Sequence, residues 1–153
     1  MKELIEIIDS ITVWGCSPIK NVNNKEKKLE NALIFLWNKF AKTDDVFDKK
    51  EYPTLQRANY HKIREHVSMN FPQFGYYHIH LNPLGVSEKP SSALGDAIDD
   101  LSDIIIDLLE IKSRFHNNSE TNALWFFKFI FKAHTKGHIL NLLRYISDAE
   151  ANK

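Results

Sequence analysis

Cysteine is nearly absent from this sequence, whose 153 residues include a single one, Cys16. One cysteine excludes an internal disulfide and is typical of proteins in a reducing compartment. Long apolar runs are also missing, because the most apolar segment, 124–131, is interrupted by Lys128 and followed by Lys132. A membrane-spanning helix needs about 20 consecutive apolar residues. The sequence therefore predicts a protein without a transmembrane segment.

Two further absences narrow the class of protein. The 20 basic and 20 acidic side chains cancel, which gives no general attraction to nucleic acid or to anionic membranes. Glu3, Glu6 and Asp9 interrupt the N-terminal apolar residues, whereas a secretory signal needs an unbroken apolar stretch. The sequence contains no glycine-rich phosphate loop, hydrolase nucleophile elbow or paired-cysteine motif. We predict a cytoplasmic protein that binds neither nucleic acid nor membrane.

What is present is the composition of an ordinary globular domain. Apolar residues make up 43% of the chain and charged residues 26%. A chain of 153 residues has the size of one domain and can bury roughly 70% of its unfolded surface. It therefore needs neither a disulfide nor a metal ion in order to fold. We predict one helical domain over residues 1–153.

The spacing of apolar residues predicts an all-α bundle of about five helices. Apolar side chains recur every three or four residues in five segments, which is the period of an α-helix. The expected helices cover 2–13, 25–41, a segment from near Pro53 to 70, 96–115 and 121–147. A turn of only a few residues separates the last two, which favours an antiparallel helical hairpin at the C-terminus.

The segment between the third and fourth helices, 71–90, is predicted to be an ordered crossover without a sheet. Its prolines and glycines rule out a continuous helix, and they are Pro72, Gly75, Pro83, Gly85 and Pro90. Residues 76–81 suit a short extended stretch, but no second strand is evident to pair with them. Ser91 and Ser92 are candidate N-caps for the fourth helix.

An acidic stripe runs along the fourth predicted helix. At 100° per residue, six acidic side chains fall within an arc of about 100°, and apolar side chains occupy the rest. The six are Asp96, Asp99, Asp100, Asp103, Asp107 and Glu110. A helix with so narrow a polar face is expected to be buried on most sides. The stripe either reaches water and pairs with lysines, or places Asp99 and Asp103 in a cavity, where their charges need a cation or basic partners.

His134 and His138 lie one helical turn apart in the last predicted helix, so both imidazoles project from one side. Such a pair can bind one metal ion. The candidate ligands of a divalent transition metal are therefore Asp99, Asp103, His134 and His138. The alternative is a structural network in which the aspartates hold buried histidines. Gly137 between the histidines costs about 1 kcal/mol relative to alanine, which suggests close packing by another element.

Residues in the second half of the chain resemble a known family. They are Asp99, Asp100, Asp103, Asp107, Trp125, Phe129, His134, Gly137 and His138, preceded by the aromatic stretch 71–77 and by Asn82 and Pro83. The pattern is similar to the bacterial family called domain of unknown function 5063, over residues 71–146. The resemblance implies a helical fold and a shared Asp/His constellation, and it brings no established activity. The chain departs from the family at Thr135, where an aromatic residue is common.

Three functions remain open from the sequence. The first is a non-catalytic module that binds another protein, which the absence of catalytic motifs favours. The second is a metal-binding protein or metal-dependent enzyme that uses the Asp/His cluster, with a bound water as the reactive group. The third is a small-ligand pocket lined by Phe127, Phe131 and Tyr145. His78 and His80, two residues apart, are expected at the surface, and the oligomeric state is left open.

Overall fold

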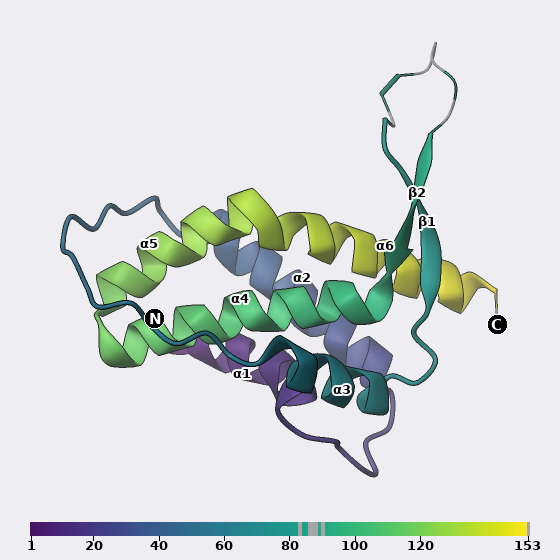
Figure 1. The fold of residues 1–153 in the computed structure, drawn as a ribbon, viewed down its shortest axis with the longest axis horizontal. Coiled ribbons are helices and arrows are strands. Elements are labelled where there is room, and N and C mark those ends of the chain that lie inside the picture. Colours follow the sequence, from purple (N-terminus) through teal and green to yellow (C-terminus); the bar gives the residue numbers. More distant parts are fainter. Residues whose placement is uncertain (83, 86–88, 90, 153) are drawn as a thin grey trace.

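The structure is a computed structural model that describes residues 1–82, 84–85, 89 and 91–152. Pro83 and Pro90, which entered the prediction of a crossover, lie outside these residues. The helices of the described chain (Figure 1) are α1 (Lys2–Cys16), α2 (Lys25–Lys42), α3 (Tyr60–Asn70), α4 (Ala97–Asn117), α5 (Glu120–Ile130), the π-helical segment η1 (Phe131–Thr135) and α6 (Lys136–Ala151). Because α5, η1 and α6 form one continuous rod, the predicted all-α bundle of about five helices is confirmed. Among the described residues no helix combines the length and apolar character needed to cross a membrane.

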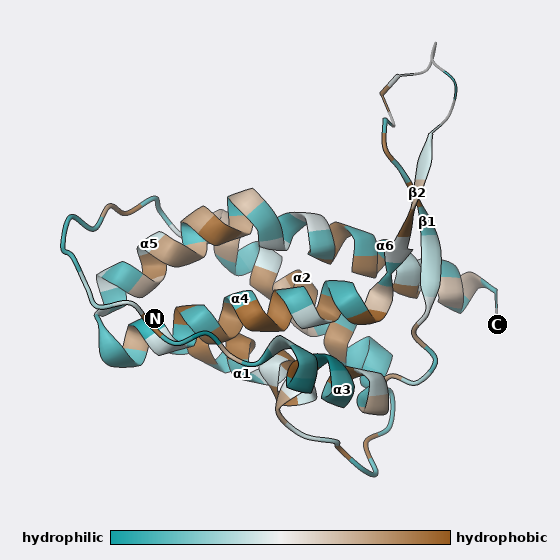
Figure 2. Cartoon of the chain, in the orientation of Figure 1, coloured by the Kyte–Doolittle hydropathy of each residue, from teal (hydrophilic) through white to brown (hydrophobic). Residues whose placement is uncertain are grey.

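Helix α4 is the central element of the bundle. It contacts α1, α3, α5 and α6, which surround it on several sides. Leu101, Ile104, Ile105 and Leu108 are fully buried, and hydrophobic positions run along α4 between its neighbours (Figure 2). The prediction that this helix is buried on most sides is therefore confirmed, and its acidic stripe must lie in or beside the interior.

Helix α4 and the α5–η1–α6 rod form the predicted antiparallel hairpin (Figure 1). Ser119 caps the second arm, because its hydroxyl oxygen accepts a hydrogen bond from the backbone N–H of Asn122 at 3.0 Å. On another side of the rod, Phe40 of α2 stacks on the fully buried Phe131, with ring centroids 4.0 Å apart. Packing from both sides fixes the rod, and with it the two histidines, against α4.

A two-stranded antiparallel sheet replaces the expected crossover, so the prediction of no sheet was wrong. Strands β1 (Tyr76–His80) and β2 (Ser92–Asp96) pair as a hairpin that projects from the bundle (Figure 1). The predicted caps Ser91 and Ser92 were also wrong, because Ser92 begins β2. The cap of α4 is Asp96, whose side chain accepts hydrogen bonds from backbone N–H groups of the first turn. The pairing partner of β1 lies more than ten residues along the chain, beyond the reach of local periodicity.

Helix α3 begins at Tyr60, later than the predicted start near Pro53. Its cap is Asn59, whose side-chain oxygen accepts a hydrogen bond from the backbone N–H of Lys62 at 3.1 Å. Proline is compatible with the first turn of a helix but does not require one. The chain before α3 instead runs along the outside of the helical hairpin formed by α4 and the α5–η1–α6 rod. There the Tyr52 hydroxyl lies 2.9 Å from the hydroxyl of Ser119.

The last predicted helix is interrupted by the π-helical segment η1, which sequence periodicity did not indicate. A π-helical turn accommodates an extra residue in the helix and occurs frequently at functional sites. Gly137 follows this segment and is exposed, and a Cβ there would meet no described atom within 4 Å beyond its own helix backbone. The predicted close packing at Gly137 was therefore wrong.

Candidate metal centre

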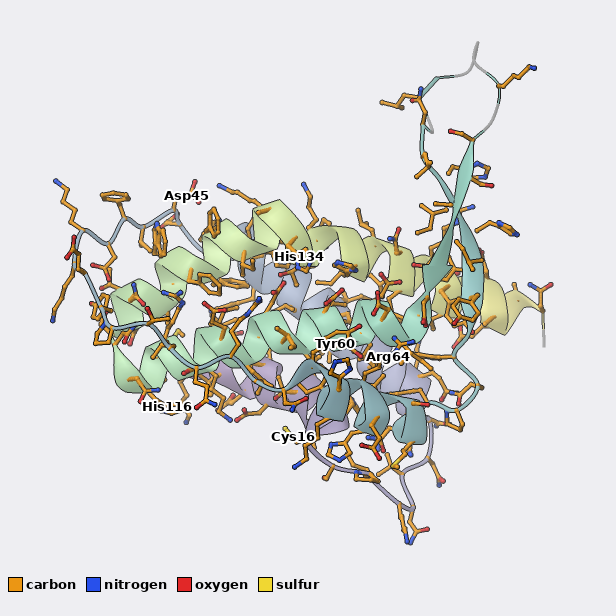
Figure 3. The ribbon with its side chains drawn as sticks, in the orientation of Figure 1. Cys16, Asp45, Tyr60, Arg64, His116 and His134 are labelled. Carbon is orange, nitrogen blue, oxygen red and sulfur yellow. The ribbon has the colours of Figure 1, made fainter. Side chains whose placement is uncertain are left out.

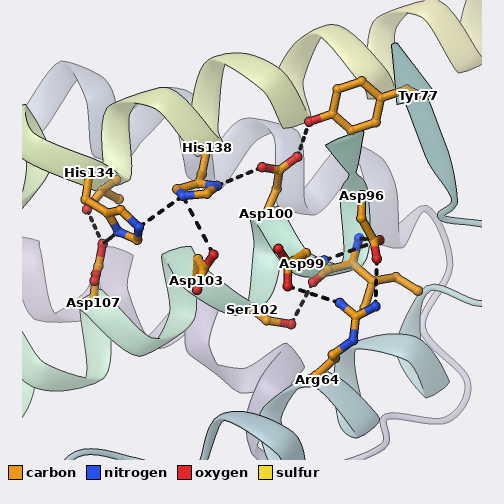
Figure 4. A network of polar contacts seen from close by, with 12 residues as sticks. Arg64, Tyr77, Asp96, Asp99, Asp100, Ser102, Asp103, Asp107, His134 and His138 are labelled. Carbon is orange, nitrogen blue, oxygen red and sulfur yellow. Dashed lines mark hydrogen bonds and ion pairs between the residues drawn. The ribbon is translucent and has the colours of Figure 1, made fainter. Parts of the chain in front are cut away.

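Three metal-ligating side chains converge where the α5–η1–α6 rod passes α4 (Figure 4). The Nε2 atoms of His134 and His138 are 3.1 Å apart. An oxygen of Asp103 lies 3.7 Å from Nε2 of His138. One ligand atom from each of the three residues lies within 4.8 Å of the other two. This geometry brings three of the four predicted ligands together.

A carboxylate contacts Nδ1 of each histidine, the ring nitrogen that does not face the other histidine. Nδ1 of His138 lies 2.7 Å from Oδ1 of Asp100, and Nδ1 of His134 lies 2.9 Å from Oδ2 of Asp107. Both aspartates are buried. In a metal-binding histidine, the ring nitrogen that does not bind the metal usually contacts a carboxylate, a carbonyl oxygen or a water. This contact fixes the orientation of the ring and its tautomer.

Two hydroxyl groups also donate hydrogen bonds to these carboxylates. Tyr77 of β1 donates a hydrogen bond to Oδ2 of Asp100, so the projecting hairpin contacts the site (Figure 4). Thr135 donates to Oδ2 of Asp107 at 2.7 Å. Thr135, the position at which the chain departs from the resembled family, is therefore part of the support.

The carboxylate contacts favour one tautomer of each histidine. An ionised carboxylate accepts hydrogen bonds, so Nδ1 of each ring carries the proton. In a neutral imidazole the other nitrogen, Nε2, then has no hydrogen. His134 and His138 would therefore direct two acceptors at each other across 3.1 Å, with the Asp103 carboxylate beside them. A cation between them, either a proton or a metal ion, would relieve the repulsion between these acceptors.

The separation of the two histidines fits direct ligation by one ion. Imidazole nitrogens bind zinc at about 2.0–2.1 Å, so ligands at angles between about 90° and 109° lie about 2.9–3.4 Å apart. The observed Nε2–Nε2 distance of 3.1 Å lies within that range. The Asp103 oxygen lies 3.7 Å from Nε2 of His138 and within 4.8 Å of the His134 ligand atom, so the Asp103 side chain must move toward the histidines to bind the same ion.

Asp99, the fourth predicted ligand, is turned away from the histidines. It accepts hydrogen bonds from Tyr60 and, at 3.3 Å, from Arg64, both on α3. Figure 3 shows Tyr60 and Arg64 on α3 beside α4. Arg64 also donates a hydrogen bond to Asp96 at 2.6 Å (Figure 4). The prediction that Asp99 belongs to the site was wrong, because its position on the stripe faces α3.

The sequence analysis placed Asp100 and Asp107 on the acidic stripe and in the family pattern, but it did not assign them as the partners of His138 and His134. A signal for them existed, because Asp100, Asp103 and Asp107 follow a helical i, i+3, i+7 spacing. In an antiparallel hairpin the residue later in one arm meets the residue earlier in the other. Asp107 accordingly pairs with His134, and Asp100 with His138.

Burial and charge shift the titration of three groups at the site. The hydrogen bond to the Asp100 carboxylate is the main cause that raises the pKa of His138, and the neighbouring aspartates add to it. Burial raises the pKa of Asp103. Burial, with the contact to Asp100, also raises the pKa of Tyr77, so this phenol stays a hydrogen-bond donor at neutral pH.

We expect the metal-free protein to lose stability as the pH rises above 6.5, the ordinary pKa of histidine. A group whose pKa is higher in the folded state contributes its full stabilisation below the unfolded pKa and loses it as the pH rises through the folded pKa. Urea unfolding at pH 6 and pH 9, in the presence of a chelator, would measure the free energy of unfolding.

The stability difference between the wild type and His138→Gln should shrink between pH 6 and pH 9. The control is His78→Gln, at an exposed histidine of β1, which reports any effect of pH that is unrelated to the site. An equal difference for His138→Gln at both pH values would contradict the expectation.

The remaining sequence candidates lie outside the cluster. Phe127 and Phe131 are fully buried in the helix packing, whereas the Tyr145 hydroxyl accepts a hydrogen bond from the backbone N–H of Gly75 at 2.9 Å. The three therefore do not line one pocket, and that hypothesis was wrong. His78 and His80 are exposed on β1, as expected.

Comparison with known proteins informs the fold. No family model matches the sequence, and no curated protein matches it. The crystal structure of protein BF1032 from Bacteroides fragilis is similar, with a TM-score of 0.73. The match covers 97% of this chain and 90% of that one, at 12% sequence identity. The resemblance to domain of unknown function 5063 stays a prediction, and the helical fold is shared with the Bacteroides fragilis protein.

Proposed function

We propose that this protein binds one divalent transition-metal ion through His134, His138 and Asp103. The observation that carries the proposal is the 3.1 Å approach of two Nε2 atoms whose Nδ1 partners are carboxylates. Asp100 and Asp107 are proposed as the supporting partners. One ion would satisfy three acceptors that otherwise face one another.

The ligand types indicate the class of ion. Two imidazoles and one carboxylate suit zinc or iron(II), and they leave coordination positions for water or a substrate. A bound ion would supply a water of lowered pKa or polarise a carbonyl group. The second hypothesis from the sequence was either a metal-binding protein or a metal-dependent enzyme. Open coordination positions favour the enzyme.

The other expectations from the sequence stay predictions. A protein partner, a cytoplasmic location and a bacterial family have no comparable geometric support in the described part of the chain. A purely structural Asp/His network would use the same carboxylate contacts. It would hold a proton between the histidines and would bind no metal, so metal binding is the property that separates the two interpretations.

Metal titration tests the proposal. We expect chelator-treated protein to bind one equivalent of Zn²⁺ in competition with a chromophoric chelator. The double variant His134→Ala/His138→Ala should lose this binding, because two of the three protein ligands are removed. The matched control is His78→Ala/His80→Ala, which removes two exposed histidines of β1 and should keep the full stoichiometry.

Circular dichroism should show that both double variants keep the helical content of the wild type. Absence of a stoichiometric Zn²⁺ equivalent in the wild type would overturn the proposal and leave the structural network. Equal binding by the two double variants would show that zinc binds elsewhere.

A further inference from the structure

An open groove of about 660 Å³ borders the candidate metal centre. It lies between α4, the α5–η1 part of the rod and the chain that enters α3. Its lining includes His134 and Asp103, two of the three proposed ligands. Pockets for small molecules have volumes of roughly 300–1,000 Å³. A molecule in this groove would therefore lie against these two residues.

The walls of the groove are mostly apolar. Ile106, Ile130 and Ala133 contribute aliphatic surface, and Phe129 contributes an aromatic ring. Phe129 is 53% exposed and stacks on Trp125 with ring centroids 5.8 Å apart. An exposed ring braced by a second ring offers a flat surface to the apolar part of a ligand.

The charge around the ion disfavours highly charged ligands. Asp100, Asp103 and Asp107 place three carboxylates in contact with the histidines, more than the two positive charges of one divalent ion. The cation that lines the groove, Arg57, lies 3.5 Å from Glu110 and is therefore already partnered. A di- or triphosphate would meet strong repulsion, a single carboxylate would meet much less, and a neutral carbonyl group would meet none.

We propose that this groove is the substrate pocket of the metal centre and accepts a carboxylic acid, ester or amide with an apolar body. The carbonyl or carboxylate oxygen binds the ion, and the body, about the size of one aromatic ring, packs on Phe129. This inference rests on the proposed metal binding. The inference adds to the proposed metal binding a class of ligand, and it names Phe129 as the residue that selects for the apolar body of that ligand.

Two hydroxamates that differ in their apolar body test the inference by calorimetry. Zinc occupancy is measured first, and then acetohydroxamate and benzohydroxamate are titrated into the zinc-loaded protein. Each affinity is normalised to that of the same compound for free Zn²⁺. We expect benzohydroxamate to bind about tenfold more tightly, because its ring contacts Phe129. The variant Phe129→Ala should reduce this ratio to about two while leaving acetohydroxamate binding unchanged.

Leu140→Ala is the matched control, because Leu140 is also 53% exposed on the same rod but does not line the groove. It should keep the tenfold ratio. Failure to bind zinc would overturn the proposed function and this inference together. Zinc binding with a ratio near one in the wild type, or a ratio that Phe129→Ala leaves unchanged, would overturn the inference alone. Tighter binding of phenyl phosphate than of benzohydroxamate would overturn the assignment of ligand class.

Discussion

Replacing Asp103 with alanine is expected to lower the Zn²⁺ affinity by at least about 100-fold. Loss of a carboxylate behind a metal-binding histidine already costs about 10–100-fold, and Asp103 is proposed to contact the ion itself. The same replacement at Asp99, one turn earlier on α4, should change the affinity less than about threefold, because Asp99 is bonded to Tyr60 and Arg64. Competition with a chelator measures both affinities.

The two variants are matched, because both positions carry an aspartate on α4 and lie one helical turn apart. Each removes one negative charge from α4, so a general electrostatic effect would weaken zinc binding similarly in both. Thermal unfolding of the metal-free variants shows whether each has folded. Equal losses in the two variants would contradict direct ligation by Asp103, and an unaffected Asp103→Ala variant would reduce the site to its two histidines.

Replacing Asn70 with alanine is expected to lower the free energy of unfolding by about 3 kcal/mol, since three backbone groups lose a buried partner. The side-chain amide of Asn70 donates to the carbonyl oxygens of Trp14 and Ser17, at 2.7 Å and 2.9 Å. Its oxygen accepts from the backbone N–H of Ile19 at 2.7 Å. Asn70 thereby connects the end of α1, and the loop that follows it, to the end of α3. Urea unfolding measures the change.

Asn152→Ala provides the comparison for Asn70→Ala. The Asn152 amide also donates to a backbone carbonyl, that of Asp148 at 2.7 Å, but at an exposed position. Water replaces that partner, so the expected loss is below about 0.5 kcal/mol. Similar losses at the two positions would show that burial of the Asn70 contacts does not determine their contribution.

The candidate site draws on three separate parts of the fold. Helix α4 provides Asp100, Asp103 and Asp107, the rod provides the histidines, and the β-hairpin provides Tyr77. The hairpin residue Gly95 explains how Tyr77 reaches Asp100. A Cβ at Gly95 would come within 2.5 Å of the Tyr77 ring, so the ring lies directly across the glycine backbone.

Local patterns predicted much of this arrangement. The 3.6-residue period is a property of each helix by itself, and it indicated the helices, the burial of α4 and the C-terminal hairpin. The same period placed His134 and His138 on one side and included Asp103 among their candidate partners. The choice between Asp99 and the pair Asp100 and Asp107 requires the rotation of α4 relative to its neighbours, which local spacing alone does not provide.

The sequence by itself determined the helical class and the C-terminal helical hairpin, and it singled out the three residues now proposed as metal ligands, because these features follow from spacing within a helix or from contacts between adjacent helices. The tertiary structure decided the β-hairpin, the late start of α3 and the π-helical segment. It also decided that Asp99 faces Arg64 while Asp100 and Asp107 hold the histidines. Each of these depends on packing between segments distant in the chain, where burial and hydrogen bonding outweigh local preference.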